Sequence, residues 1–434
     1  MPTTRRDLLS GIACGAGAGA VSSLLPLRAR AQADAAAGLE ARIRADLEQH
    51  AAFGPKFSGG PGDVATAGWI SGRLRDAGYR VEESAADMPF FIERSARLEV
   101  GPVSAPVVPQ APVVTTGSAG VTASLALAEG EVGDVRGRIA VLMTPFGRHA
   151  ALFPNRGIGQ TVTQIAEAGA RAIVIVTNGP SGEAVALNAP EEPFVPVPTA
   201  VLAPKHAEPL VGAARSGAEA TLVLDGEATH RPSPNIVAHI ERGERWIVMS
   251  TPRSGWYDCV AERGTGTAAF LEIADWAVQR FPNHSVWLMN TGGHEYFFAG
   301  SHRVVDQAPP PEDTLVWAHV GATLAARGTE ERNGRLVMLD IADPGRTLMA
   351  SDAARDAAAE AFSGLSGLST PTAIRPGAGE LSAFTDRGYE TAFAVLGLHA
   401  WFHTVEDTLE RADAGLVVPV LRAHQRAIEL LADA

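Results

Sequence analysis

Cysteine is scarce in this chain, and its scarcity excludes a disulfide framework. The 434 residues include only two cysteines, Cys14 and Cys259. Cys14 lies in a segment with the features of a cleavable export signal, so the mature chain would keep Cys259 alone and could form no intrachain disulfide. The hydrophobic core must then stabilise the fold, and a hydrophobic content of 46% is ample for that purpose.

Positive charge and long apolar runs are also limited. The formal net charge is −13, and Lys56 and Lys205 are the only lysines. No basic run follows the first few dozen residues, which argues against a nucleic-acid partner. No later stretch reaches the roughly 18 consecutive apolar residues that a membrane-spanning helix needs. The sequence also has no contiguous HExxH and no paired CxxC, so any metal ligands must come from distant segments.

The N-terminal residues predict export. Paired arginines, Arg5 and Arg6, precede a Gly/Ala-rich apolar run, and small-residue cleavage sites follow at 29–33. This pattern is typical of a twin-arginine signal over residues 1–33, with an ordinary secretory signal as the alternative. We therefore expect a periplasmic or secreted protein.

Strand and helix patterns alternate through most of the chain. They predict an α/β fold in which a mostly parallel sheet carries helices on both faces. We assign residues 34–99 and 232–434 to this domain. The Pro/Val-rich character of the intervening stretch predicts a smaller, β-rich inserted domain over 100–231, and RPSPN at 231–235 is expected to form the hinge back.

Polar residues cluster where predicted strands end. In a mostly parallel sheet, ligands bind beyond the carboxyl ends of the strands, so these clusters should converge. Histidine and glutamate are common metal ligands and proton carriers, and their convergence would be typical of a metallohydrolase. The clusters are Arg253 to Arg263, His294-Glu295, His319, Glu380 and His403 to Asp407.

Three segments resemble one family in order along the chain. GTGTAAFLEIADWA, NTGGHEYFFAGSHRV and FHTVEDTLERAD are similar to successive motifs of the co-catalytic zinc aminopeptidases, a family that also includes glutaminyl cyclases and transferrin-receptor-like ectodomains. The stretch over 100–231 is similar to the protease-associated domain that some members carry. The resemblance implies the same α/β architecture for nearly all of the mature chain.

The family's metal-site pattern is altered in this chain. Pro252 and Ser254 stand where the family has a His-x-Asp pair, and Ala318 replaces another ligand aspartate. One metal position has therefore lost both of its private ligands. The resemblance implies that the other position is retained, with one zinc ion held by Glu262, Glu295 and His403.

The resulting functional expectation is an exported hydrolase of peptide or amide bonds with a single zinc ion. His294 stands at the family's general-base position and would carry the proton next to Glu295. The substrate would be a small peptide or amide, and the oligomeric state stays open. We expect the substrate pocket to include Arg253, Trp256, Tyr257, Asp258, His319 and Glu380.

Several alternatives remain open at this stage. The chain could be a non-catalytic pseudopeptidase that binds a peptide or protein, or a metal-free hydrolase built around Asp258, Glu262 and His294. Glu262 could simply pair with Arg263 at a helix start. A Cys259 nucleophile lacks a second supporting feature, and Ser254 lacks a GxSxG elbow.

Overall fold

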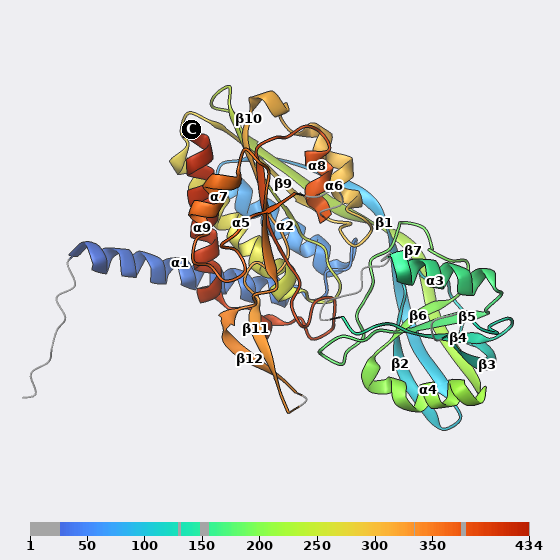
Figure 1. Cartoon of the computed structure of the whole chain (residues 1–434). Helices are drawn as coiled ribbons and strands as arrows, with labels where there is room; N and C mark the ends of the chain where they lie inside the picture. The colour runs from blue at the N-terminus through green and yellow to red at the C-terminus, as the bar shows by residue number, and fades with distance from the viewer. Residues whose placement is uncertain (1–26, 129–131, 148–155, 334, 375–378, 434) are drawn as a thin grey trace, which may run out of the picture. The chain divides into compact units, whose positions relative to one another are not determined.

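The computed structural model describes residues 27–128, 132–147, 156–333, 335–374 and 379–433 (Figure 1). Residues 1–26, most of the predicted export signal, lie outside the described residues. The chain forms two compact units, Met1–Gly38 and Leu39–Ala434, and the second contains all the strands of the described residues. Helix α1 spans Leu27–Ala52, so the predicted cleavage point before Asp34 falls within a helix. No helix among the described residues is long and apolar enough to cross a membrane.

Four parallel strands form the centre of the sheet and confirm the predicted architecture. Their side chains are almost all buried and mostly apolar, as expected for parallel strands covered on both faces. Antiparallel neighbours flank them on both sides, so the sheet is mixed, and the antiparallel pairs are β7 with β9 and β13 with β15. The order across this region is β7, β9 (Ser285–Thr291), β8 (Trp246–Pro252), β10 (Thr314–Val320), β15 (Ala392–Gly397), β13 (Arg346–Ala350) and β14 (Thr372–Ala373).

Each face of this sheet packs against its own hydrophobic cluster. In β8, Ile247 and Met249 face one cluster and Val248 faces the other, which is the alternation of a strand. Trp317 anchors the second cluster, where it stacks on Phe384 at 4.0 Å between ring centroids. Helices α2 (Pro61–Asp76), α5 (Thr265–Arg280), α7 (Arg355–Ala361) and α9 (Ala414–Ala432) pack on the first face, and α8 (Ser382–Thr385) packs on the second.

Two long antiparallel strands, β1 (Arg80–Val100) and β7 (Glu219–Ile240), run beside this sheet and pair along nearly their whole length. The predicted hinge at 231–235 lies inside β7 and pairs with residues 84–88 of β1, so that prediction is wrong. Its two prolines suggested a turn. Over this stretch β1 is the only described strand that pairs with β7, and a proline without an N–H is tolerated on such an edge.

The distal parts of β1 and β7 belong to a ring of seven strands. The ring closes because β1 pairs with both β2 and β7. Two further hydrophobic clusters pack on opposite faces of these strands: one includes Leu210 of α4, the other Val162 and Ile165 of α3, and Figure 1 shows these helices on opposite sides of the strands. The protease-associated-like domain over 100–231 stays a prediction, supported by these separate clusters. The elements are β2 (Val103–Pro109), β3 (Val121–Ala128), β4 (Ile139–Met143), α3 (Arg156–Glu167), β5 (Ala172–Val176), β6 (Thr199–Leu202) and α4 (Ala207–Ser216).

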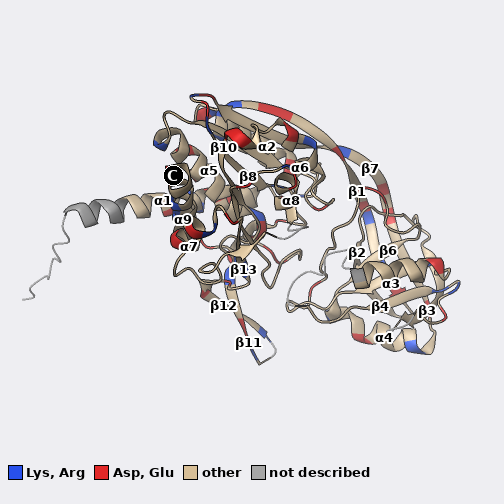
Figure 2. Cartoon of the chain, turned by 45° about the horizontal axis from the view of Figure 1, so that its top comes forward, with Lys and Arg blue, Asp and Glu red and all other residues tan. Residues whose placement is uncertain are grey.

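A two-stranded hairpin and short helical turns complete the described chain. Figure 2 shows acidic and basic residues interspersed along its described elements. The hairpin consists of β11 (Arg327–Arg332) and β12 (Arg335–Ala342), which pair antiparallel. The remaining elements are α6 (Ala299–Val304) and the turns η1 (Pro204–His206), η2 (Val260–Gly264), η3 (Val305–Gln307), η4 (Pro311–Asp313), η5 (Gly379–Leu381) and η6 (Leu409–Arg411).

Candidate functional site

The loops that follow the central strands meet at one edge of the sheet, as the strand-end pattern predicts. A π-helical turn, η2, follows β8 and carries Glu262 and Arg263. A tight turn after β9 carries His294 and Glu295, and the loop after β15 carries His403. Each of these residues has a contact to at least one other predicted strand-end residue.

Arg263 contacts two of the predicted metal ligands. Its Nη2 atom lies 2.8 Å from Glu262 Oε1 and 3.4 Å from Glu295 Oε1. Its Nε donates a 2.8 Å hydrogen bond to the carbonyl oxygen of Ser254. All three ion-paired side chains are at most 1% exposed. Glu262 therefore pairs with Arg263, as the structural alternative for Glu262 expects.

Glu295 is held by further hydrogen bonds. Its Oε2 accepts from Ser254 Oγ at 2.7 Å and from Ser58 Oγ at 3.3 Å. Ser254 Oγ also accepts from the His294 backbone N–H at 3.1 Å. Both Glu295 oxygens thus have donors, and the carboxylate acts as a structural acceptor.

His403 contacts the same carboxylate oxygen of Glu262 as Arg263 does. Its Nε2 is 3.4 Å from Glu262 Oε1, and its Nδ1 donates to the Ala186 carbonyl at 3.0 Å. Burial raises the pKa of Glu262, but attraction to Arg263 and then to His403 outweighs burial and lowers it to about 2. The two carboxylate oxygens of Glu262 and Nε2 of His403 have no hydrogen-bond partner.

The three predicted zinc ligands, as they lie, do not fit a metal ion. A zinc ligand set needs carboxylate and imidazole atoms directed at one open point. Here Glu295 accepts hydrogen bonds from two hydroxyl groups. The guanidinium group of Arg263 contacts the carboxylates of both Glu262 and Glu295. Among the described residues, no group of three or more His, Cys, Asp or Glu side chains is arranged to hold a metal.

A second polar cluster forms around Glu380. Its Oε2 lies 3.6 Å from His294 Nδ1 and 3.8 Å from His319 Nε2, and its Oε1 accepts from Thr291 Oγ1 at 2.7 Å. Ser250 Oγ accepts a hydrogen bond from the Trp317 indole N–H. The Ser250 hydroxyl can therefore donate its own proton to His319 Nδ1, which lies 2.8 Å away. Burial lowers the pKa of His319 to about 4, so this ring is neutral near neutral pH. His294 is the partly exposed member, with 14% of its side chain accessible.

Three further residues near the strand ends are buried or half-buried. Arg253 is fully buried, and its Nε donates to Asp63 at 2.8 Å while its Nη1 donates to Asn290 at 2.6 Å. Burial raises the pKa of the Cys259 thiol well above its usual value, which disfavours a nucleophilic thiolate. Asp258 is half-buried. Neither Arg253 nor Asp258 lines the large cavity described below.

Unusual backbone geometry is concentrated at this edge. Tyr257, Cys259, Phe297, Phe298 and His403 all have φ between 40° and 63°, the left-handed region that non-glycine residues rarely adopt. The turn after β9 is tight because Gly300 approaches it closely: a Cβ there would lie 2.0 Å from the Gly292 carbonyl oxygen. Strain of this kind clusters at functional sites, which supports this edge as the region of interest.

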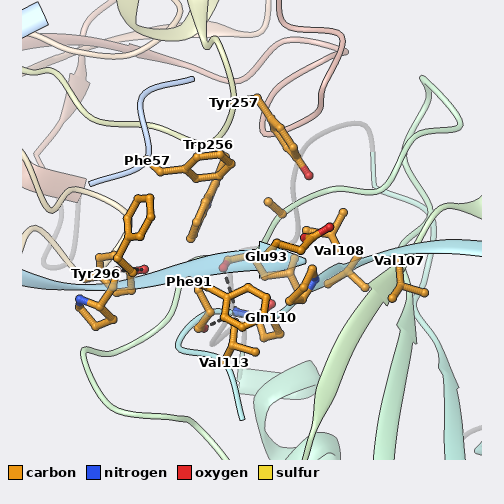
Figure 3. A pocket seen from close by; sticks show the side chains of 17 residues that line it. Phe57, Phe91, Glu93, Val107, Val108, Gln110, Val113, Trp256, Tyr257 and Tyr296 are labelled. Carbon is orange, nitrogen blue, oxygen red and sulfur yellow. Dashed lines mark hydrogen bonds between the residues drawn. The ribbon is translucent and has the colours of Figure 1, made fainter. Parts of the chain in front are cut away.

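A cavity of about 340 Å³ lies beside the polar clusters. Figure 3 shows Phe57, Trp256 and Tyr257 on one side of it and Phe91 and Gln110 on the other. Its lining also includes Pro89, Phe90, Glu93, Val107, Val108, Pro109, Ala111, Val113, Ala186, Leu187, Val201 and Tyr296.

The cavity carries hydrogen-bond acceptors among its apolar walls. Gln110 Nε2 donates to two carbonyl oxygens, whereas its buried Oε1 has no partner. Burial raises the pKa of Glu93. Burial, and secondarily the negative charge of Glu93, raises the pKa of Tyr257, which indicates that these groups share one environment.

Sequence reasoning found only part of this cavity. Of the six predicted pocket residues, Trp256 and Tyr257 line it, whereas Arg253, Asp258, His319 and Glu380 do not. The missed residues lie on β1, β2 and β6, in the segments around Phe57, Gln110 and Ala186, and at Tyr296 after β9. Their sequence signal is weak, because apolar strand residues look alike whether they face a core or a cavity.

Comparison with known proteins identifies the fold. No protein-family model and no curated protein sequence matches the chain. A peptidase M28 precursor from Shewanella amazonensis is similar in structure, with a TM-score of 0.70 and 16% identity over 92% of this chain and 96% of that one. A zinc aminopeptidase from Bacillus subtilis has a TM-score of 0.68 and 17% identity over 90% and 94%.

An aminopeptidase from Aneurinibacillus sp. strain AM-1 is also similar, with a TM-score of 0.65 and 17% identity over 90% of this chain and 93% of that one. The chain therefore has the fold of zinc aminopeptidases, and the predicted resemblance is confirmed at the level of the fold. At these identities the likeness establishes no shared activity.

Proposed function

We propose that this protein binds peptides through the aromatic cavity and does not act as a zinc hydrolase. The observation that carries this proposal is the contrast between the two parts of the site. The carboxylates and His403 are buried and held by ion pairs and hydrogen bonds, whereas the open volume lies beside them and is lined by aromatic rings. Structural neighbours named as aminopeptidases favour a peptide as the ligand.

The lining also favours a particular peptide chemistry. Aromatic and valine side chains would bury a large apolar side chain, such as that of phenylalanine or leucine. The Glu93 carboxylate and the unpartnered Oε1 of Gln110 can both accept hydrogen bonds. They would therefore pair with an amino group or an amide N–H of the ligand. The expected ligand is a short peptide with a large apolar residue next to a free amino end.

Calorimetric titration with matched peptides tests this proposal. Peptides that begin with phenylalanine should bind the wild-type protein, and their N-acetylated forms should bind more weakly. Glu93→Gln should weaken binding of the free-amine peptide about tenfold, because a charge-assisted hydrogen bond is lost. It should change binding of the acetylated peptide little.

Glu82→Gln is the matched control, since Glu82 lies on the same strand as Glu93 but does not line the cavity. It should leave both affinities unchanged. Equal binding of free-amine and acetylated peptides, or no binding of either, would contradict the proposal. Cleavage of the peptides during the titration would be detected as product by mass spectrometry and would also count against it.

The single-zinc hydrolase remains the alternative, and one observation favours it. Glu262 Oε1 and Oε2 and His403 Nε2 are buried without hydrogen-bond partners, and the two side chains approach to 3.4 Å. These are two of the three ligands that the sequence implies. The metal measurements below distinguish this alternative from the peptide-binding proposal.

A further inference from the structure

The positive charge of Arg263 lies between the side chains that the sequence assigns to a metal ion. Its guanidinium contacts Glu262 and Glu295, which come from different loops, and its Nε is bonded to the backbone of a third residue, Ser254. We propose that Arg263 is an internal cation that takes the place of the metal, so that this fold is complete without one.

Charge balance is the first argument. Two buried carboxylates cannot be left without compensation, because moving an unpaired charge out of water costs several kcal/mol. In zinc enzymes the metal supplies the compensating charge. In this chain Arg263, 1% exposed, is the cation in contact with both carboxylates. A guanidinium suits this role because it stays charged when buried and presents several donors in one plane.

The local backbone is the second argument. Adjacent residues in a regular α-helix point about 100° apart, so Glu262 and Arg263 would not normally face the same cluster. The π-helical turn η2 changes this, and its wider winding is visible where Gly264 N–H bonds to the Cys259 carbonyl five residues back. Glu262 and Arg263 are both buried, and their side chains contact each other at 2.8 Å.

The unpartnered atoms near Arg263 indicate which side chains would line the space left by its removal. Glu262 and His403 already approach to 3.4 Å, and Glu295 Oε1 lies 3.4 Å from the Arg263 Nη2 atom that also contacts Glu262. Without Arg263, two carboxylates and one imidazole would surround the space that it leaves. That donor set is one that Zn²⁺ accepts.

Thermal unfolding of the full-length protein tests the proposal, with EDTA and then with zinc chloride. Wild-type Tm should be the same in both conditions. Arg263→Ala should lower Tm in EDTA by at least about 5 °C, because two buried carboxylates lose their counterion. Zinc should restore part of that loss in Arg263→Ala and none of it in the double variant R263A/H403A.

Arg253→Ala is the matched control. It also removes a buried arginine from a carboxylate. Among the described residues, however, Arg253 forms an ion pair with Asp63 alone, and no histidine is among its hydrogen-bond partners. It should lose stability without being rescued by zinc. The proposal is overturned if R263A is as stable as wild type, if zinc does not raise its Tm, or if zinc stabilises wild type equally.

A second variant keeps the test decisive if R263A does not fold. The triple variant R263M/E262Q/E295Q removes the cation together with both anions, and neutral replacement of a buried ionic group is often tolerated. It should fold and unfold at a higher temperature than R263A. Failure of the triple variant to fold would refute charge balance as the role of Arg263. Because none of these readouts uses peptide, the result is separable from the peptide-binding proposal.

Discussion

At the scale of single residues, Ser254 connects the two polar clusters. Its hydroxyl donates to Glu295 Oε2 at 2.7 Å and accepts from the His294 backbone N–H at 3.1 Å, and its carbonyl accepts from Arg263. One small side chain therefore fixes the turn after β9 against the loop after β8. An aspartate at this position would instead place a third carboxylate beside Glu262 and Glu295.

We predict that Ser254→Ala destabilises the protein by about 2 kcal/mol, because a buried carboxylate loses its shortest hydrogen bond. Urea unfolding followed by tryptophan fluorescence measures this change. Ser369→Ala is the control, since the exposed Ser369 hydroxyl donates only to the Leu365 carbonyl, and it should cost less than about 0.5 kcal/mol. Equal stability of S254A and wild type would show that this bond has no structural role.

Single residues also show which contacts of the site could not be predicted from the sequence. The strand-end pattern and the family motifs predicted that residues 262, 295 and 403 lie at one edge of the sheet, and the structure brings them into contact with Arg263 or with one another. They did not reveal that the neighbour of Glu262, Arg263, would contact both carboxylates. That outcome depends on a π-helical turn and on which side chain fills a small space. Neither is indicated by a periodic pattern in the sequence.

At the scale of elements, the last helix shows how burial controls charge. α9 begins at an Asp413 cap whose carboxylate accepts from Gly415 N–H at 2.8 Å. Further along, His424 is buried against the rings of Phe362 and Phe393. Burial lowers the pKa of His424 to about 4, although a hydrogen bond from Nδ1 to the preceding turn partly opposes the shift.

This shift predicts how stability depends on pH. The folded pKa of His424 lies below the unfolded value of 6.5, so the unfolded chain binds protons first as pH falls. Stability is therefore complete above pH 6.5 and declines as pH falls toward 4. Between pH 7.5 and 5, His424 should account for a loss of about 2 kcal/mol. His424→Gln, measured by urea unfolding at both values, should reduce that loss.

Exposed His302 supplies the control for this experiment. His302→Gln should leave the pH dependence as it is in the wild-type protein. An H424Q protein whose stability falls with pH as steeply as that of the wild type would contradict the account of α9.

Elements also differ in how readily sequence reveals them. The central strands were predicted to be parallel because strand patterns alternate with helix patterns along the chain. β7 was divided wrongly, because Pro232 and Pro234 resemble a hinge. A proline prevents strand pairing only where a second partner needs its N–H, and that depends on the neighbouring strand rather than on the local sequence.

At the scale of the whole molecule, the protein keeps the fold of zinc aminopeptidases while its polar site is internally compensated. The cavity beside that site combines residues of β1 and β2 with Trp256 and Tyr257 after β8. This arrangement supports the proposal that the molecule binds peptides on this fold. Its acidic net charge of −13 favours ligands with a free amino group over acidic ones.

Calorimetric titration of zinc into the EDTA-treated, full-length wild-type protein tests the central claim most directly. If Arg263 replaces the metal, wild-type and His403→Ala proteins should give the same heats, with no saturable event that depends on His403. One zinc ion bound per wild-type chain, and lost in both His403→Ala and Glu262→Ala, would contradict the account and restore the single-zinc hydrolase.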